Sequence, residues 1–572
     1  MKTEGVWTLK LAIIAATFAF VATPVFAQPD KPSAKPKLIV AISVDQLSAD
    51  LFAQYRGKVT GGLKRLQSGV VFPSGYQSHA ATETCPGHST ILSGVRPATS
   101  GLAANDWFGM RGDKFDEIYC VEDESVAGSS HDNYTVSLTH LLPTFQTLGD
   151  RLKAQAGSAS RVFAVSGKDR GATLMAGRNA DQTYWYDWRA RGFTTYVGRA
   201  SADVNKAIPA LKSVNARIAA WIAKPVAAPP LPPQCVAQRE PLALGKFIIG
   251  DGPEAFPRVD KPDNTAKDFR GTRAIDVATL DIAQSMITAN ALGQGKGTDV
   301  LAISLSGTDY IGHAYGPQGP EMCAQIASID ARLEQLFLSL DKRKVDYAVV
   351  LTADHGGFDA TDRHKARAYP AAMAVTLKTA APLLSAMLAK QFGLTGTLIE
   401  NRGIGGDYWL TPAVPVERRA EAAAWLKQAL LSSNNDEIET VFTKADMAGV
   451  AMPSGDPSLW SIAQRVRASY DSGTATRSGR SGDIYIVMGH GVHGIPAGTR
   501  GYVSTHGTVW DYDRRVPILF WWRGVKGFEQ PMGVETVDIL PTLASLIGLD
   551  LSTAPVDGRC LDLDRSAANT CK

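Results

Sequence analysis

Runs of apolar residues recur along the chain, and most of them are apolar at every position rather than at alternate positions. They cover residues 38–44 (LIVAISV), 161–166, 300–306, 347–353, 483–488 and 516–522. Strands that are apolar on both faces are typical of a mainly parallel sheet covered by helices on both sides. Helical periodicity between the runs, for example over 274–291 and 420–430, supplies such helices. The pattern predicts an α/β fold, a three-layer sandwich around a mainly parallel sheet.

Two stretches interrupt this alternation, and we expect them to be insertions that form a cap or crown over the sheet. The stretch from about 175 to 270 contains an aromatic run at 184–188 and a proline-rich segment at 225–233. The stretch from about 365 to 480 contains a helical pattern and a Ser/Gly-rich segment. Segments rich in proline, glycine and serine are typical of surface loops. We therefore expect one domain over 38–572 that carries both insertions.

The first 27 residues have the pattern of a secretory signal peptide. Two lysines flank a short polar start, an apolar run covers 11–22, and residues 25–27 (VFA) end in the small-x-small pattern of a cleavage site. The apolar run is short for the roughly 20 residues of a membrane-spanning helix, so cleavage is favoured over an uncleaved anchor. Residues 28–37 (QPDKPSAKPK) are expected to be a flexible tether. The sequence thus predicts a periplasmic or secreted protein with no membrane span after cleavage.

Composition and charge exclude several classes of protein. The 572 residues are 45% hydrophobic and 20% charged, with a mean hydropathy of −0.07, which is typical of a globular chain and not of a disordered or fibrous one. Lys and Arg number 59 against 56 Asp and Glu, for a net charge of +3. Because the charge is nearly balanced and no basic run occurs, nothing indicates a nucleic-acid partner. We expect a monomer that acts on a small molecule.

The cysteine content fits an exported chain. The six cysteines form an even set, as expected for disulfides in an oxidising compartment, and their spacings do not match a thiolate metal site. Six cysteines allow fifteen pairings, and the sequence does not choose among them. Three pairs are our prediction, with free buried cysteines as the alternative. The pairs are Cys85–Cys120, Cys235–Cys323 and Cys560–Cys571.

Residues that can bind metal ions lie at the ends of the apolar runs. Ligands of open α/β sheets bind beyond the carboxyl ends of the strands, so these residues could meet at one edge. Alone, each short motif is more often a surface turn or a helix cap. Together, three aspartates and three histidines have the donor atoms that two zinc ions need. The six are Asp45, Asp309, His313, Asp354, His355 and His506.

A threonine in the segment 82–91 (TETCPGHSTI) is the candidate nucleophile. Pro86 near the start of an apolar helical pattern signals a helix entry, which puts Thr84 in the first turn. A hydroxyl group there lies at the positive end of the helix dipole, which suits attack on a phosphate. A free threonine is not ionised at neutral pH, so a metal ion has to lower its pKa. On this segment alone, a plain N-cap threonine is the simpler interpretation.

The order of these motifs resembles that of the alkaline phosphatase superfamily. The motifs span residues 38 to 550, and 537–549 (VDILPTLASLIGL) is similar to the closing helix of that superfamily. Asn105 in AANDWF and the loop 167–172 (GKDRGA) further resemble the secreted, zinc-dependent bacterial enzymes that use threonine in place of serine, the phosphate-irrepressible type. The resemblance therefore implies an alkaline phosphatase, a phosphoric monoester hydrolase.

The resemblance also implies a role for each candidate residue. Asn105, Lys168 and Arg170 would hold the non-bridging phosphate oxygens. His490 and His493 are alternatives to His506, which we prefer because the segment from 505 (THGTVWDYDRRVPILF) matches the superfamily's loop that runs into a final strand. The other histidines are expected to be structural or exposed. The two implied zinc sites are Asp45, Thr84, Asp354 and His355 for one ion, and Asp309, His313 and His506 for the other.

The implied activity is zinc-dependent hydrolysis of phosphate monoesters with broad specificity, through a phosphothreonine at Thr84, for phosphate scavenging outside the cytoplasm. One alternative is a nucleotide pyrophosphatase/phosphodiesterase of the same superfamily, which has less need of both Lys168 and Arg170. A sulfatase would require an arginine that the segment after Cys85 lacks. A cofactor-independent phosphoglycerate mutase would be cytosolic and use serine. The alternative from another class is a secreted, non-catalytic binding protein on this fold.

Overall fold

The structure is a computed structural model, and it describes residues 1, 35–131, 133–196, 209–244, 247–254, 265–433, 435–496, 502–565 and 569–571. The chain divides into Met1–Lys35 and Pro36–Lys572, and the described helices and strands belong to the second unit. Residues 2–27 of the predicted signal peptide and 28–34 of the predicted tether lie outside the described residues. In the described part of the chain, no helix has the length and apolar character that a membrane span requires.

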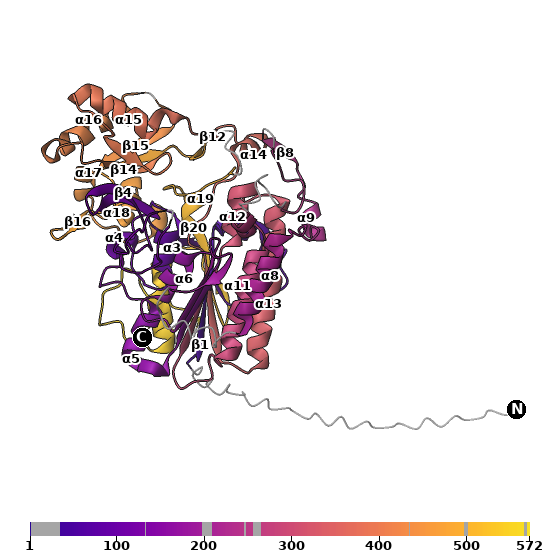
Figure 1. Cartoon of the computed structure of the whole chain (residues 1–572). Coiled ribbons are helices and arrows are strands. Elements are labelled where there is room, and N and C mark those ends of the chain that lie inside the picture. The colour runs from indigo at the N-terminus through magenta and orange to yellow at the C-terminus, as the bar shows by residue number, and fades with distance from the viewer. Residues whose placement is uncertain are drawn as a thin grey trace. The chain divides into compact units, whose positions relative to one another are not determined.

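A ten-stranded sheet forms the centre of the second unit (Figure 1). Its strands are β1 (Leu38–Val44), β2 (Val70–Tyr76), β5 (Val162–Ser166), β6 (Gln182–Asp187), β7 (Gly192–Thr194), β10 (Asp299–Leu305), β11 (Tyr347–Thr352), β20 (Arg515–Trp522), β21 (Phe528–Glu529) and β22 (Val534–Glu535). Their order is β21-β2-β20-β11-β1-β10-β5-β6-β7, with β22 beside β2. β11, β1, β10, β5 and β6 are parallel, whereas β20 and β7 run antiparallel to their neighbours. The predicted mainly parallel sheet is confirmed.

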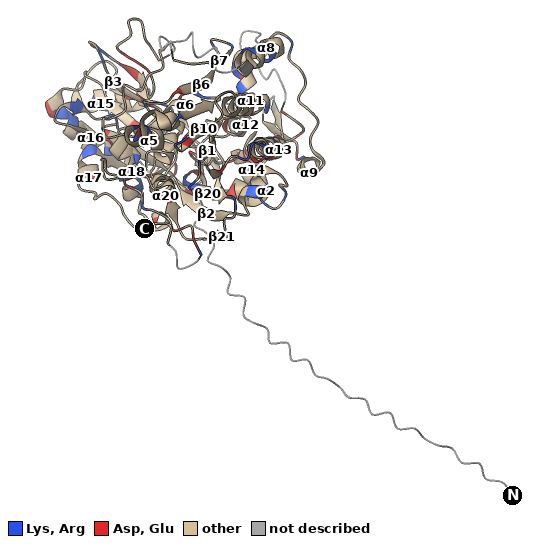
Figure 2. Cartoon of the chain, turned by 90° about the horizontal axis from the view of Figure 1, so that it is seen from below, with Lys and Arg blue, Asp and Glu red and all other residues tan. Residues whose placement is uncertain are grey.

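Helices cover both faces of this sheet (Figure 2). One layer contains α8 (Pro209–Ala223), α11 (Ala274–Ala289) and α13 (Pro320–Lys342), and the other contains α3 (Thr84–Ile91), α5 (Leu148–Ala156), α6 (Asp169–Ala176) and α20 (Ile539–Ile547). Alternate residues of a strand point to opposite faces. Accordingly, Val40 and Ile42 of β1 belong to the first hydrophobic core, while Ile39 and Ala41 belong to the second. The three-layer prediction is confirmed.

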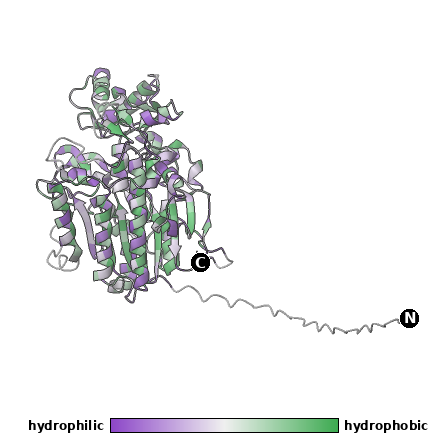
Figure 3. Ribbon diagram, turned by 90° about the vertical axis from the view of Figure 1, so that its right-hand side faces the viewer, coloured by the Kyte–Doolittle hydropathy of each residue, from purple (hydrophilic) through white to green (hydrophobic). Residues whose placement is uncertain are grey.

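A smaller antiparallel sheet stands beyond the carboxyl ends of the central strands (Figures 1 and 3). Its order is β13 (Ile399–Asn401), β14 (Gly406–Leu410), β18 (Ile484–Met488) and β15 (Ile438–Thr443), and it packs against α15 (Ala381–Phe392) and α16 (Arg419–Leu431). The prediction that the apolar run over 483–488 belongs to the main sheet is wrong. This run forms β18, in the middle of the smaller sheet. Helices α15 and α16 cover one face of this strand, and another segment of the chain covers its other face.

The other elements are short. They are α1 (Ala49–Tyr55), α2 (Gly62–Leu66), α4 (Pro97–Ser100), β3 (Asp106–Arg111), β4 (Lys114–Tyr119), α9 (Pro233–Val236), β8 (Leu242–Leu244), β9 (Phe247–Ile249), α10 (Thr265–Asp268), α12 (Gly307–Tyr315), α14 (Thr361–Ala366), β12 (Met373–Ala374), α17 (Lys444–Ala448), α18 (Ile462–Ser469), β16 (Gly473–Thr474), β17 (Arg477–Ser478), β19 (Val492–His493) and α19 (Asp511–Arg514). Of these, the β3–β4 hairpin and α12 carry residues of the candidate site.

The structure departs from the sequence prediction in two further strands. The aromatic run 184–188, expected in a cap, lies largely in β6, which pairs in parallel with β5. Strand β2 was not predicted, because Pro73 and Gly75 interrupt its apolar pattern, and the pairing with β20 shifts register between Phe72 and Gly75.

All three predicted disulfides are present. They are Cys85–Cys120, Cys235–Cys323 and Cys560–Cys571.

Candidate active site

The carboxyl ends of the parallel strands place three aspartates at one edge of the sheet. Asp45 follows β1, Asp309 lies in the first turn of α12 after β10, and Asp354 follows β11. All three carboxylates are buried. The neighbouring strands are in parallel register, so their ends coincide and the three side chains converge.

The histidines complete two overlapping groups of possible metal ligands. In one group, ligand atoms of Asp45, Asp354 and His355 lie within 4.8 Å of one another. In the other, those of Asp309, His355 and His506 do so. His313, one helical turn after Asp309, places its Nε2 3.2 Å from Asp309 Oδ1. The structure therefore brings together all six residues that the sequence pattern selected.

The three imidazole rings are oriented by backbone carbonyl groups. His313 Nδ1 lies 2.7 Å from Ser504 O, His355 Nδ1 lies 2.9 Å from Gly356 O, and His506 Nδ1 lies 2.8 Å from Thr82 O. A neutral imidazole that donates from Nδ1 presents an unprotonated Nε2 on its other side. Backbone hydrogen bonds of this kind are the usual support of metal-binding histidines.

The electrostatics of the cluster fit added positive charge. Burial and a neighbouring carboxylate raise the pKa of Asp45 well above its ordinary value. Burial opposes ionisation of Asp309, but the Lys168 ammonium group together with His313 and His506 outweighs it, and the pKa of Asp309 lies well below the ordinary range. Burial lowers the pKa of His355 to about 3, so this ring is neutral. The cluster thus holds more carboxylate charge than Lys168 can balance.

Two buried atoms test whether metal ions fit. Asp45 Oδ1 and His355 Nε2 lie 3.5 Å apart, and neither has a hydrogen-bond partner among the described residues. Burying unpaired polar atoms is costly, and both are ligand atoms that zinc accepts. The donor set of carboxylate oxygens and Nε2 atoms therefore fits a divalent metal ion such as zinc.

Thr84 begins helix α3 beside this cluster. The hydroxyl oxygen accepts hydrogen bonds from Lys168 Nζ at 3.2 Å and from Arg170 Nη2 at 3.4 Å. Gly87 permits the close approach of α3 to the end of β11, because a Cβ atom there would lie 2.0 Å from the Asp354 carbonyl oxygen. Thr84 therefore lies at a helix N-terminus and beside Lys168 and Arg170, the two cations that were predicted to hold phosphate oxygens.

Asn105 lies beside the start of α3, where two hydrogen bonds fix its position. Its Oδ1 accepts from the Cys85 backbone N–H at 2.7 Å, and its backbone N–H donates to Glu83 Oε2 at 2.7 Å. The side-chain NH₂ group remains as a donor for a ligand. The disulfide from Cys85 to Cys120 ties this segment to the start of α3.

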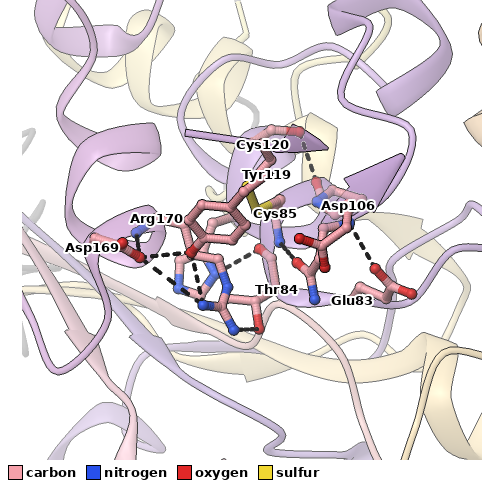
Figure 4. The surroundings of a disulfide bond; sticks show 12 residues. Glu83, Thr84, Cys85, Asp106, Tyr119, Cys120, Asp169 and Arg170 are labelled. Carbon is pink, nitrogen blue, oxygen red and sulfur yellow. Dashed lines mark hydrogen bonds and ion pairs between the residues drawn. A yellow bond between two sulfur atoms is a disulfide. The ribbon is translucent and has the colours of Figure 1, made fainter. Parts of the chain in front are cut away.

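A tyrosine and an aspartate orient Arg170. Arg170 Nη1 donates to the Tyr119 hydroxyl at 2.9 Å, and that hydroxyl donates to Asp169 Oδ1 at 2.7 Å (Figure 4). Tyr134 donates to the other oxygen of Asp169 at 2.8 Å. Since the guanidinium group is held at Tyr119, its second nitrogen is directed at Thr84.

The site opens into a cavity of about 630 Å³. Thr84, Asn105, Arg170, Asp309 and His506 line its floor together with other residues of the main domain. Residues 403–407 and 485–488 of the smaller sheet line the same cavity. The part of the chain that follows residue 365 therefore forms one wall of the cavity.

Sequence reasoning missed several residues that contact the site. Gln46, which has a positive φ of 66°, donates from its backbone N–H to Asp354 and from its amide to Asp309, both at 3.2 Å. His88 Nδ1 lies 3.0 Å from Asp354 Oδ2. Its position four residues after Thr84, one helical turn on, is the signal that could have found it. No local pattern marks Gln46, because its contacts join distant strands.

The chain is similar to known proteins in sequence and in fold. The family model of type I phosphodiesterases and nucleotide pyrophosphatases matches residues 39–507. The chain is 45% identical over 540 residues to the alkaline phosphatase PhoK of a Sphingomonas species, across 94% of this chain and 92% of the relative. It is 41% identical over 547 residues to the alkaline phosphatase PhoD of Zymomonas mobilis, across 94% and 90%. The crystal structure of the wild-type alkaline phosphatase PafA matches with a TM-score of 0.75 and 25% identity, covering 93% of this chain and 99% of that one.

Replacing Tyr119 by phenylalanine tests how Arg170 is oriented. The change removes two hydrogen bonds, one from the Arg170 guanidinium group and one to the Asp169 carboxylate. We expect the Kd for inorganic phosphate to rise about 5- to 30-fold in a calorimetric titration. Tyr134→Phe is the matched control, because it also removes a bond to Asp169 but none to Arg170, and a change below about threefold is expected. In the Arg170→Ala background, Tyr119→Phe should add little. A full additional loss there would contradict the positioning role.

Proposed function

The chain belongs to the type I phosphodiesterase and nucleotide pyrophosphatase family of the alkaline phosphatase superfamily, and from that premise we propose that it is a zinc-dependent alkaline phosphatase with Thr84 as nucleophile. One observation carries the proposal. The Thr84 hydroxyl lies at a helix N-terminus, within 3.4 Å of two cationic side chains and beside the cluster of aspartates and histidines. This arrangement suits transfer of a phosphoryl group to Thr84.

The reaction is a double displacement at phosphorus. In the first step, the Thr84 hydroxyl loses its proton, Oγ1 forms a bond to phosphorus, the ester bond breaks on the opposite side, and the departing alcohol gains a proton. In the second step, a water molecule loses a proton and its oxygen bonds to phosphorus, the bond to Thr84 breaks, Oγ1 regains a proton, and inorganic phosphate leaves. Lys168, Arg170 and the Asn105 amide hold the non-bridging oxygens in both steps, and such positioning provides most of the catalysis in phosphoryl transfer.

The metal-binding residues divide between two ions. Two zinc ions, when bound, supply the positive charge that lowers the pKa of a hydroxyl nucleophile and stabilises a departing oxygen. Carbonyl groups keep the histidine Nε2 atoms directed at the site, and Gln46 holds Asp309 and Asp354 in place. We assign Asp45, Thr84, Asp354 and His355 to one ion, and Asp309, His313 and His506 to the other.

Monoesters are favoured over diesters by the number of donors around Thr84. A monoester has three non-bridging oxygens and up to two negative charges, whereas a diester has two such oxygens and one charge. Asn105 approaches Thr84 from the side of the β3–β4 hairpin, and Lys168 and Arg170 approach from α6. Three donors of this kind match three oxygens, and the extra group of a diester would collide with one of them.

Two features support action outside the cytoplasm. Three disulfides are typical of an oxidising compartment, and the sequence begins with the pattern of a signal peptide. We propose a periplasmic or secreted enzyme with broad specificity that releases phosphate from small esters. The non-catalytic alternative is disfavoured because the proposed nucleophile, phosphate-binding groups and metal ligands lie close together at one edge of the sheet. The monomeric state stays a prediction.

Removal of metal ions should abolish activity. The six carboxylate and imidazole ligands have affinity for zinc, so a chelator should reduce p-nitrophenyl phosphate hydrolysis to background, and added zinc should restore it. Metal analysis of the active protein should give two zinc ions per chain. Full activity in protein shown to contain no metal would disprove the proposed mechanism.

Replacing Thr84 by alanine should stop turnover, whereas replacing it by serine, which keeps a hydroxyl group, should preserve part of the activity. We expect Thr84→Ala to lower kcat at least about 10³-fold, because the attacking oxygen is gone, and Thr84→Ser to keep substantial activity. Acid trapping during turnover should label Thr84 with phosphate. A label on Ser89 or Thr90 would identify a different nucleophile, although both hydroxyls donate to backbone carbonyls inside α3.

Neutralising both cations should separate monoester from diester hydrolysis. Charge-assisted hydrogen bonds contribute roughly 1.5–3 kcal/mol each, so Lys168→Ala/Arg170→Ala should lower kcat/KM for p-nitrophenyl phosphate about 10²- to 10⁴-fold. Hydrolysis of bis-p-nitrophenyl phosphate should fall much less. Lys168 also lies 2.7 Å from Asp45 and Asp309, so zinc content is measured in the same samples. Equal losses on both substrates at full zinc content would rule out this discrimination.

A further inference from the structure

One wall of the cavity carries positive charge beyond the three donors around Thr84. We propose that this wall is a second anion subsite, which binds a second phosphate group carried by the leaving group of the substrate. The subsite consists of Lys267 and Arg270, held by the rings of Trp188 and Tyr310. The inference rests on the proposed function, since it concerns the leaving group of the same reaction.

The subsite is continuous with the place where the reacting phosphate binds. Lys168 Nζ lies 5.1 Å from the centre of the Tyr310 ring, and Arg270 Cζ lies 4.8 Å from the same centre. Arg270 also donates to the Tyr310 hydroxyl at 3.3 Å. Since one ring contacts both cations, Arg270 lies one side chain away from the floor of the cavity. A short leaving group can therefore reach it.

A second aromatic ring holds the outer part of the subsite. Lys267 Nζ lies 4.1 Å from the centre of the Trp188 ring, and Arg189 Cζ lies 4.7 Å from it. Trp188, Arg189, Lys267, Arg270 and Tyr310 all line the cavity. The Trp188 ring contacts two cations. Its role in this structure is therefore to hold these cations in place and not to stack on a nucleobase.

The way in which these cations are held points to an anionic ligand. An ion pair with a carboxylate would position a cation and also cancel its charge. An aromatic ring positions a cation through its quadrupole and leaves the net charge unchanged. Among the described residues, no ion pair joins Lys267 or Arg270 to a carboxylate, and both reach the cavity. Their positive charge is therefore available to a ligand.

The opposite wall of the cavity provides a contrast. There, Arg402 contacts Asp106, Glu117 and His131, so the positive charge of Arg402 is balanced by carboxylates. These contacts join the β13–β14 loop to the β3–β4 hairpin and are structural. On the wall with Trp188 and Tyr310, by contrast, Lys267 and Arg270 lie against aromatic rings. An anionic leaving group would therefore be directed to that side.

The favoured substrates are small phosphate monoesters with a second phosphate a few bonds from the reacting one, such as sugar bisphosphates. The test uses fructose 1,6-bisphosphate and fructose 6-phosphate with the zinc-loaded enzyme, and p-nitrophenyl phosphate as a substrate that lacks the second anion. We expect kcat/KM for the bisphosphate to exceed that for the monophosphate about tenfold at low ionic strength. Screening by salt should reduce this preference, because the subsite is partly exposed.

The variant Lys267→Ala/Arg270→Ala should remove most of the preference and change p-nitrophenyl phosphate hydrolysis by less than about threefold. The matched control is Lys342→Ala/Arg343→Ala, which also removes one lysine and one arginine. These two residues lie at the end of α13, next to the amino end of β11, so the control should keep the preference. Equal losses on all three substrates, no preference in the wild-type enzyme, or loss of the preference in the control would overturn the second subsite. If the wild-type enzyme fails to hydrolyse p-nitrophenyl phosphate at all, the proposed function itself is wrong, and the subsite falls with it.

Discussion

Three carboxylates are buried at one edge of the sheet, and the Lys168 ammonium group lies 2.7 Å from two of them, Asp45 and Asp309. Like charges in a dry environment repel strongly, so this arrangement is stable only with cations among them. The parallel strands force the carboxylates together, because they end at the same level. Much of the site's surroundings can be understood as a response to this constraint, from the lowered pKa of His355 to the Gln46 backbone in the left-handed region.

Around this charge cluster, separate parts of the chain hold the reacting groups in fixed relative positions. The start of α3 presents Thr84, and the Cys85–Cys120 disulfide ties α3 to the hairpin segment that carries Asn105 and Tyr119. Tyr119 in turn orients Arg170 from α6. A displacement of any one of these elements would move a donor away from the phosphate, and tenths of an ångström matter for such charge-assisted bonds.

The smaller antiparallel sheet explains how the reacting groups at the floor of the cavity can act on a particular set of substrates. The floor belongs to the main sheet, whereas the walls come from 403–407, from the β3–β4 hairpin and from the segment around Trp188. The floor recognises the phosphoryl group, which every ester substrate has. The walls meet the leaving group, so differences in charge there, such as the cations beside Trp188, affect which esters are preferred.

The sequence by itself determined the layers and the chemistry of the site. Its apolar runs placed β1, β5, β10, β11 and β20 within a residue of their observed bounds, because strands buried on both faces have a strong local signal. Residues directly after those strands include Asp45 and Asp354, and strand ends in parallel sheets are predictable meeting points. The resemblance to a known superfamily then added Asn105, Lys168 and Arg170, which the structure brings to Thr84.

Only the tertiary structure decided what depends on contacts between distant segments. The apolar run at 483–488 has the same local pattern as a central strand, yet pairing with β14 and β15 places it in the smaller sheet. Gln46 contacts Asp354 and Asp309 from more than 260 positions away in the chain, so no local pattern could mark it. The charge available beside Trp188 likewise depends on which side chains meet there. Burial and strand pairing are properties of the folded chain. A local sequence pattern indicates them only where the contacting residue is close by in the sequence.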